Sequence, residues 1–170
     1  VGEFYIINLK ENNWKFIDVT VYDEEQLREY ISGIESESLE IKLKNDITLE
    51  KNLIVYVSDK GLTLDLAGNT LDTNNHDLAF IYGISDLDKD TNDYHYYFNG
   101  LLTLTDSSAA NTGKIITNSS IRFYNDDVTH KSELKNFDLT INGGTYVYNN
   151  VDGKSVFDLF GYSNNLKDNN

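Results

Sequence analysis

The sequence contains no cysteine, no proline and no methionine among its 170 residues. Without cysteine, the chain has no disulfide framework, no thiolate metal site and no cysteine nucleophile. Basic residues are scarce, because 14 Lys and Arg stand against 28 Asp and Glu, which gives a net charge of −14. A strongly negative protein repels phosphate backbones and anionic membrane surfaces. We therefore expect no nucleic-acid partner.

Long hydrophobic runs are also absent. The longest apolar stretches, such as residues 53–57, fall far short of the ~20 residues that a membrane-spanning helix needs. We therefore expect no direct membrane insertion. The chain starts at Val1, and 12 of its residues are Tyr. With the wealth of Asn and Asp, these features favour a segment of a larger bacterial polypeptide, secreted or at the cell surface, whose signal peptide has been removed.

One segment has the pattern of an amphipathic helix. Asp23 is a suitable N-cap, and Gln26 stands three residues later, as in a capping box. An apolar stripe at helical spacing follows, formed by Leu27, Tyr30, Ile31 and Ile34. We predict a helix over residues 23–34, preceded by an extended or hairpin segment over residues 1–21.

From residue 39 onward, apolar and polar residues alternate, which is typical of strands. Short strands separated by Asn, Asp, Gly and Lys fit either an antiparallel β-sandwich or a solenoid of parallel strands. A repeat favours the solenoid, because a pattern of two aliphatic residues around a Thr begins at residues 62, 102 and 139. We predict an all-β fold, a right-handed parallel β-helix over residues 22–163 capped at its N-terminal end by the helix. The antiparallel β-sandwich is the alternative.

Several segments carry a likeness to a known family. They are residues 23–27, 41–49, 62–71, 100–108, 113–117 and 139–146. These segments resemble the pectate-lyase-like β-helix domains of bacterial surface and secreted proteins. The resemblance implies the β-helix fold and, for many members, an adhesin-like role in the cell envelope; a minority are polysaccharide lyases, hydrolases or phage tailspikes. The clustered acidic calcium ligands and neighbouring basic residue on which such lyases depend have no counterpart that we can identify here.

The stretch between the first two repeats departs from the strand pattern. We interpret residues 72–98 as an insertion with a local excess of aspartate. Asp86, Asp88 and Asp90 have the alternate spacing with which a calcium loop directs successive oxygens at one ion, so calcium is a candidate cofactor. An EF-hand is excluded, because Tyr97 stands where its bidentate Glu belongs. We favour a solvated acidic loop over a bound ion, and therefore expect no cofactor, with calcium as the alternative.

Ring-bearing side chains follow directly after these aspartates. Exposed rings offer flat apolar faces on which a sugar or a partner side chain can rest. The candidate ligand-binding residues are Tyr94, His95, Tyr96 and Tyr97. Their expected partner is a glycan or a host or cell-surface protein. Alternation favours another interpretation, in which Tyr94, Tyr96 and Phe98 point into the core as part of a strand and leave His95 and Tyr97 outside.

No catalytic constellation is visible in the sequence. The three histidines are isolated from one another, and no phosphate-binding glycine loop or His-Glu-x-x-His motif occurs. We therefore expect a non-catalytic binding or structural module, adhesin-like and glycan-contacting, that ends in a polar tail over residues 164–170. Two alternatives stay open, namely a fragment of a carbohydrate-active β-helix enzyme and an assembly or spacer element of a larger surface fibre.

Overall fold

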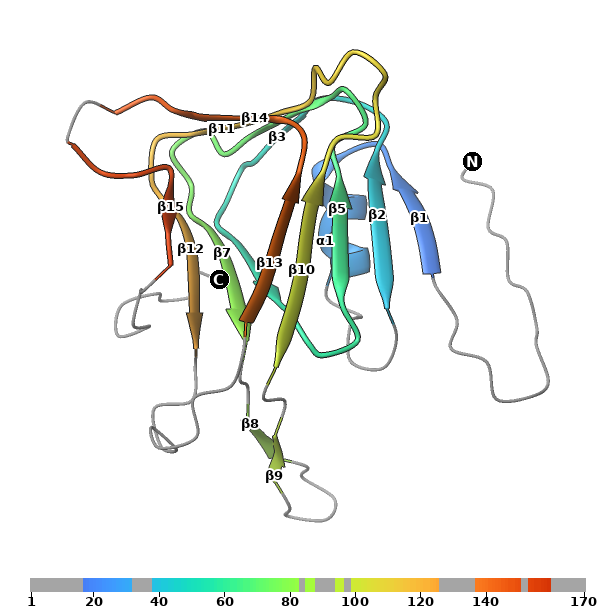
Figure 1. The fold of residues 1–170 in the computed structure, drawn as a ribbon, viewed down its shortest axis with the longest axis vertical. Helices are drawn as coiled ribbons and strands as arrows, with labels where there is room; N and C mark the ends of the chain where they lie inside the picture. The colour runs from blue at the N-terminus through green and yellow to red at the C-terminus, as the bar shows by residue number, and fades with distance from the viewer. Residues whose placement is uncertain are drawn as a thin grey trace.

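The structure of the chain is a computed structural model, which describes residues 17–31, 38–82, 85–87, 94–96, 99–125, 137–150 and 153–159. Most of the predicted N-terminal segment and the predicted tail, residues 164–170, lie outside these residues. The described part is all-β with one short helix, α1 (Glu24–Ile31). Most strands lie in three parallel sheets, which Figure 1 shows around a common interior.

The three sheets are defined by their strand order. Sheet A contains β1 (Ile17–Val21), β2 (Leu39–Leu43), β5 (Leu62–Asp65), β10 (Gly100–Thr105) and β13 (Phe137–Asn142). Sheet B contains β14 (Thr145–Tyr148), β11 (Lys114–Thr117), β6 (Thr70–Asp72) and β3 (Ile47–Thr48). Sheet C contains β15 (Phe157–Asp158), β12 (Ile121–Asn125), β7 (Leu78–Tyr82) and β4 (Leu53–Tyr56).

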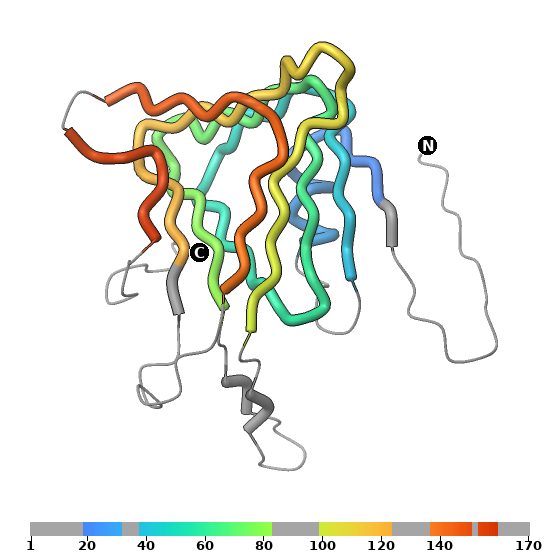
Figure 2. Tube along the Cα trace, in the orientation of Figure 1, coloured from blue at the N-terminus to red at the C-terminus, as the bar shows by residue number. Residues whose placement is uncertain are grey.

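The chain visits the three sheets in the same order on each pass. Strands β2, β3 and β4 lie in sheets A, B and C, and β5 to β7, β10 to β12 and β13 to β15 repeat that path. We call these passes coils 1 to 4; Figure 2 traces them as stacked loops of the Cα tube. The only antiparallel pairing among the described strands joins β8 (Ser85–Leu87) to β9 (Tyr94–Tyr96). The topology is compatible with a parallel β-helix, and the antiparallel β-sandwich does not fit it.

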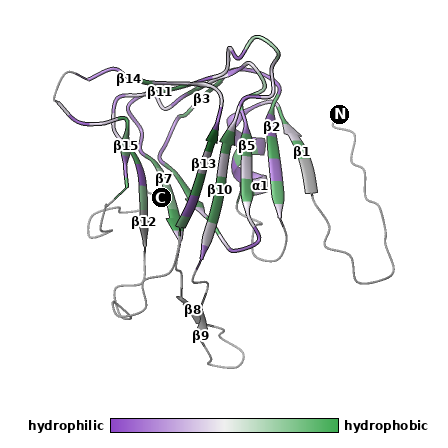
Figure 3. Ribbon diagram, viewed as in Figure 1, coloured by the Kyte–Doolittle hydropathy of each residue, from purple (hydrophilic) through white to green (hydrophobic). Residues whose placement is uncertain are grey.

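The three predicted repeats lie side by side in sheet A. Thr103 of β10 pairs with Thr63 of β5 on one side and with Thr140 of β13 on the other. The aliphatic residues around each Thr therefore stack in columns from coil to coil. Leu64 and Leu104 stand in one such column and are 3% and 1% exposed. Figure 3 shows the alternation of hydrophobic and hydrophilic residues along β2.

One continuous core fills the space between the sheets and extends under α1. Aromatic rings run through its sheet C side, where Phe80 of coil 2 stacks on Phe123 of coil 3 with ring centroids 5.4 Å apart. Phe123 in turn contacts Phe157 of coil 4, with centroids 5.9 Å apart. These rings join three coils through one line of contacts, which resists sliding of one coil over the next.

Part of the predicted insertion belongs to the regular coil. Residues 72–82 contain the end of β6 and all of β7, and β7 pairs with β4 and β12 in sheet C. Ala79 and Ile81 are 0% and 4% exposed and form a separate small cluster with Ile54. A strand that is buried on both faces reads as a continuous apolar run without alternation. The run from residue 78 to residue 82 is of that kind.

Candidate functional site

The ligand-binding and calcium residues predicted from the sequence are only partly described. Strands β8 and β9 place the backbone of Asp86 opposite that of His95, and Tyr94 and Tyr96 opposite Leu87 and Ser85. This pairing brings the aspartate segment and the ring segment together as neighbouring strands. Asp88, Asp90 and Tyr97 lie outside the described residues. Calcium binding and ligand contact at this hairpin therefore stay predictions.

Two kinds of functional feature are absent from the described residues. Within the described ranges, no group of three or more His, Asp or Glu side chains is arranged to hold a metal ion. No helix in that part of the chain is long and apolar enough to cross a membrane.

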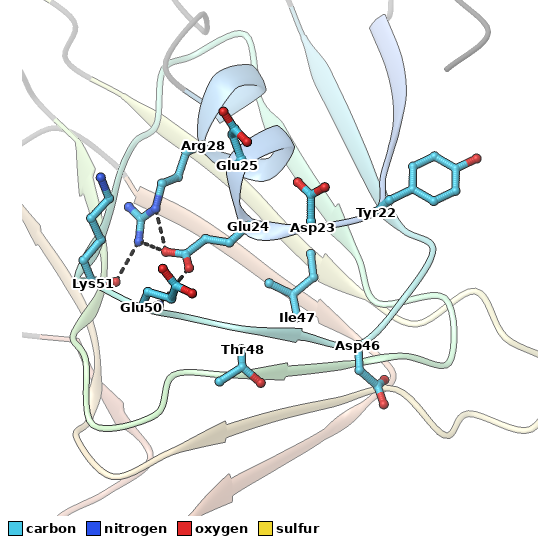
Figure 4. Close-up of a pocket in the computed structure, with 10 residues that line it drawn as sticks. All are labelled: Tyr22, Asp23, Glu24, Glu25, Arg28, Asp46, Ile47, Thr48, Glu50 and Lys51. Carbon is cyan, nitrogen blue, oxygen red and sulfur yellow. Dashed lines mark hydrogen bonds and ion pairs between the residues drawn. The ribbon is translucent and has the colours of Figure 1, made fainter. Parts of the chain in front are cut away.

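The described residues form an open cleft of about 860 Å³ beside α1. Its walls are the N-terminal half of the helix and the turns that flank β3 in coil 1, as Figure 4 shows. The lining residues are Tyr22, Asp23, Glu24, Glu25, Arg28, Asp46, Ile47, Thr48, Glu50 and Lys51. Five carboxylates and two cations thus share one cleft, and its potential is negative.

The helix wall of the cleft is fixed by a capping arrangement. The Gln26 N–H donates to Asp23 Oδ1 at 2.9 Å, which satisfies one of the free donors at the helix start. Gln26 Oε1 accepts a hydrogen bond in return from the Tyr22 N–H at 3.0 Å, one residue earlier than in the standard capping box. Leu27 and Ile31 are 0% and 7% exposed and anchor the opposite face of α1 in the core. The predicted helix start is confirmed, as is the burial of Leu27 and Ile31 from the predicted stripe, whereas Ile34 lies outside the described residues.

An ion pair joins the helix to coil 1. The Arg28 guanidinium donates to Glu24 Oε1, and it also donates to the backbone carbonyls of Lys51 and Asn52 at 2.7 and 2.9 Å. Glu24 Oε2 accepts from the backbone N–H of Glu50 at 2.7 Å, so the pair binds both donors and acceptors of the same turn. Figure 4 shows the bonds that Arg28 forms with Glu24 and with the Lys51 carbonyl. Because the planar guanidinium fork serves three acceptors at once, Lys is no substitute for Arg28.

The remaining lining residues differ in whether their side chains form hydrogen bonds. Asp46 Oδ1 accepts from the Thr70 N–H of coil 2 at 2.6 Å, which is a structural bond between coils. The side chains of Glu25 and Glu50 take part in no hydrogen bond or ion pair with described residues. Tyr22 is 44% exposed at the rim. Free carboxylates beside an exposed ring can accept hydrogen bonds from hydroxyl groups or attract a cation, and they repel anions.

Two buried carboxylates bind coils 2 and 3 to each other where sheet A turns into sheet B. Asp65 of coil 2 accepts from the Ser107 N–H of coil 3 at 2.8 Å. Asp106 of coil 3 accepts in return from the Gly68 N–H of coil 2 at 2.8 Å, and from the N–H of Gly113 at 2.6 Å. The two coils therefore exchange charge-assisted hydrogen bonds across one corner.

Burial and hydrogen bonding act in opposite directions on these two carboxyls. Burial raises the pKa of Asp65, but the Ser107 hydroxyl and N–H, the Ala67 N–H and the Lys42 ammonium together lower it below the usual value of 3.8. Burial likewise raises the pKa of Asp106, and hydrogen bonds from neighbouring N–H groups and a hydroxyl outweigh it, so the net direction is also downward. Both groups are therefore carboxylates at neutral pH.

Coil 4 places a phenol near this corner. Burial, with a smaller contribution from the Asp106 charge, raises the pKa of Tyr146 to about 12. Its hydroxyl oxygen is buried, and no described group forms a hydrogen bond with it. The phenol is therefore neutral and is not positioned as a proton donor or acceptor for any described side chain.

Comparisons with known proteins add no assignment: no family model, no curated protein and no solved structure matches this chain.

The cleft and the corner carboxylates were not predicted as sites. The sequence pattern predicts Asp23 as a helix start, and nothing local in it places Asp23, Glu24 or Glu25 beside Glu50. The signal that could have found the cleft is the short distance along the chain between the helix and coil 1, combined with acidic residues in both. Asp65 and Asp106 could have been found as the acidic residues at the ends of the first two repeats, since Asp65 is the last residue of one repeat strand and Asp106 directly follows the other.

Proposed function

We propose that this chain is a non-catalytic, adhesin-like binding and structural module of a bacterial protein that is secreted or exposed at the cell surface. Its frame is a right-handed parallel β-helix of the pectate-lyase-like kind, with α1 as the N-terminal cap. The repeated path through sheets A, B and C supports the β-helix, and the strong preference for right-handed crossovers between parallel strands supports its hand.

The observation that carries the proposal is that charged side chains are bonded to backbone groups of the fold. Asp65 and Asp106 hold neighbouring coils together, and the Glu24–Arg28 pair binds the exposed turn of coil 1. Charged groups that an enzyme would direct at a substrate are here bonded to backbone. A rigid frame that presents its surface, with few free polar groups inside, is what a binding or spacer module requires.

Ligand contact is expected at the acidic cleft beside α1, in addition to the predicted hairpin of β8 and β9. The free carboxylates of Glu25 and Glu50 and the exposed ring of Tyr22 suit a neutral, hydroxyl-rich glycan. Uronic acid polymers and phosphorylated glycans are disfavoured, because the cleft and the whole chain are negative.

The test is a glycan-binding screen of the purified chain against neutral, amino and acidic saccharides, paired with a cleavage assay on the same polysaccharides. Binding of neutral saccharides without product formation is the expected result. In the double variant Glu25→Gln and Glu50→Gln, which removes two unengaged carboxylates, binding should weaken several-fold without loss of stability. The exposed pair Asp138→Asn and Asp59→Asn, away from the cleft, is the matched control for net charge.

The outcomes separate the candidate functions. New reducing ends or unsaturated sugar products would show a carbohydrate-active enzyme and would overturn the non-catalytic proposal. Binding that is unchanged in the cleft variant would move the contact to another surface, the hairpin first. Absence of binding to every saccharide class would leave no support for a glycan-contacting module.

A spacer or assembly role is a second candidate, favoured by the exposure of coil 4. Ile141 stands in the column of Leu64 and Leu104, yet it is 44% exposed whereas they are almost fully buried. A column that ends uncovered is what a longer stack of coils would leave when only part of it is present. If the full gene continues into further coils, a longer chain that includes them should bury Ile141, which reduced amide exchange along β13 would report.

A further inference from the structure

Two Asn-Gly dipeptides occur in this chain, Asn99-Gly100 and Asn142-Gly143. Both asparagines are exposed, but Gly100 is buried and Gly143 is only partly buried. An Asn followed by Gly is open to ring closure, because glycine has no side chain to hinder attack by its own backbone nitrogen on the preceding side-chain amide. The reaction still requires that the amide group be accessible, that the N–H be free, and that the backbone between them rotate. Local structure therefore decides which of the two dipeptides reacts.

Asn142-Gly143 meets the first two of these conditions. Asn142 is exposed at the end of β13, and neither its side chain nor the Gly143 N–H forms a hydrogen bond with any described residue. Gly143 and Gly144 both have positive φ, +100° and +79°, which is the glycine-specific conformation of a tight corner. Only the backbone carbonyl of Asn142 is engaged, by the Asp106 N–H at 3.3 Å and the Thr105 hydroxyl at 2.9 Å.

Asn99-Gly100 does not meet them. Gly100 is buried at the start of β10 and pairs with Phe137 of β13. A methyl group added at Gly100 would lie 2.7 Å from the Phe137 ring and 2.8 Å from Tyr82 Cβ, so the backbone is enclosed by bulky side chains. At Gly143 the nearest atom, 2.8 Å away, is the amide oxygen at the end of the Asn111 side chain, which can rotate away. Asn99 already has an interaction partner. The rotation that ring closure needs is blocked here by packing.

We propose that Asn142 is a site of spontaneous deamidation in the folded protein, selective over Asn99. The Gly143 nitrogen bonds to Asn142 Cγ while the Cγ–Nδ2 bond breaks; the proton of the Gly143 N–H leaves with the amide nitrogen as ammonia, and a succinimide ring remains. Water then adds to one of the two ring carbonyls. Opening at Cγ gives aspartate, and opening at the backbone carbon gives isoaspartate with the chain routed through the side chain.

The product changes the corner that joins coil 3 to coil 4. Aspartate at position 142 adds a negative charge next to Asp106, whose backbone N–H donates to the carbonyl of residue 142. Isoaspartate adds a backbone carbon and displaces that carbonyl. The modification therefore loosens coil 4, the coil that is already the most exposed.

The test follows the wild-type chain during incubation at mildly alkaline pH, where loss of the N–H proton is favoured. Peptide mapping by mass spectrometry gives the rate of amide loss at each asparagine, and isoaspartate is quantified in the same peptides. In the folded protein, we expect the peptide with Asn142 to deamidate many-fold faster than the peptide with Asn99. In urea the two rates should converge, since the dipeptides are then alike.

Two variants sharpen the experiment. Asn142→Gln keeps the backbone carbonyl and its two hydrogen bonds but requires a larger, slower-forming ring, so charge heterogeneity of the aged protein should disappear. Asn99→Gln should leave that heterogeneity unchanged. Equal rates at the two sites in the folded chain, or equal protection of the two sites relative to urea, would overturn the proposal.

Discussion

The two ends of the stack of coils have similar strands but very different surroundings. At the N-terminal end, α1 lies against coil 1, and Ile47 and Leu53 of that coil are 3% and 2% exposed. At the C-terminal end, Ile141 of coil 4 is 44% exposed although its register with Leu104 points it along the same column. An alternating pattern thus sets the direction of a side chain, and a neighbour on each side is needed to bury it.

Backbone groups show the same contrast. The turn between β3 and β4 in coil 1 is bonded to two side chains of α1, Arg28 and Glu24. Unpaired backbone groups at the end of a sheet invite association with other chains, and a covering element with matched polar groups prevents it. Among the described residues, β13 pairs on one side only, with β10. The comparison predicts that substitutions cost more at the N-terminal end.

The largest expected effect is a loss of packing under the helix. Leu27→Ala should lower the free energy of unfolding by about 2–5 kcal/mol, because Leu27 is fully buried and its removal leaves a cavity between α1 and the core. Ile141→Ala, the matched truncation at the other end, should cost about 1 kcal/mol or less, since much of its surface is already in water. Urea denaturation of both variants checks the difference. Equal losses would show that coil 4 is covered as well as coil 1.

The corner carboxylates should give the next largest effect. Asp106→Asn should cost about 1.5–3 kcal/mol, because hydrogen bonds from N–H groups to a charged acceptor are lost. The exposed Asp138→Asn serves as the control and should change the stability little. Amide exchange should accelerate most at Gly68 and Gly113, whose N–H groups lose the charged partner. An effect no larger than that of the control would show that the corner is held by other contacts.

The same carboxylates determine how acid affects the fold. Because the pKa values of Asp65 and Asp106 are lowered in the folded chain, their contribution to stability is present above the ordinary value of 3.8. It is lost as the pH falls below that value and through the folded-state pKa. Wild-type stability should therefore decline below about pH 4, and Asp106→Asn should show a shallower decline. Parallel declines in the two proteins would contradict this assignment.

The elements that could be predicted from sequence are those with long or repeated patterns. Asp23, Gln26 and Leu27 defined the start of α1, and the Leu-Thr-Leu repeats defined three strands that prove to be neighbours in sheet A. Strands β3 and β6 have two and three residues, too few for a period to show. Strand β7 was placed within the insertion, because burial on both faces removes the alternation by which a strand is recognised.

The candidate site was less predictable, because it depends on contacts between coils. Asp65 and Asp106 lie far apart in sequence and come together only when coil 3 stacks on coil 2. Arg28 was visible as a helix residue, but its carbonyl partners at Lys51 and Asn52 follow from the way α1 docks on coil 1. A sequence pattern indicates which side of a strand or helix a residue faces. These bonds depend on the register between neighbouring coils and on how α1 packs against coil 1, which the pattern does not give.

A smaller effect is expected from the ion pair at the N-terminal end. Arg28→Lys should cost about 0.5–1.5 kcal/mol, since an ammonium group does not reproduce the forked contacts to two carbonyls and Glu24. The side chain of Lys51 lines the same cleft and forms no bond with described residues. Lys51→Gln should therefore change the free energy of unfolding little. Thermal unfolding at low and high salt separates the two variants. If Lys51→Gln loses as much stability as Arg28→Lys, the effect comes from the overall negative potential of the cleft and not from the specific bonds of Arg28.

The smallest effect on stability at neutral pH is expected at the C-terminal end, at Tyr146. Its hydroxyl is buried without a described partner, so Tyr146→Phe should be neutral or slightly stabilising there. The wild type and Tyr146→Phe should differ in stability only at alkaline pH. Because the folded-state pKa is about 12 and the ordinary value is 10.0, the phenol favours the folded chain fully below pH 10.0, and that contribution is lost as the pH rises through about 12.

An ultraviolet titration compares the wild type with Tyr146→Phe. The difference between the two curves should show one phenol that ionises late, near pH 12, and the variant should retain more of its stability between pH 10 and 12. A difference curve centred near pH 10.0 would mean that water reaches the hydroxyl and that coil 4 is open at its interior as well as along β13. That result would extend the contrast between the two ends from the side chains of one column to the whole last coil.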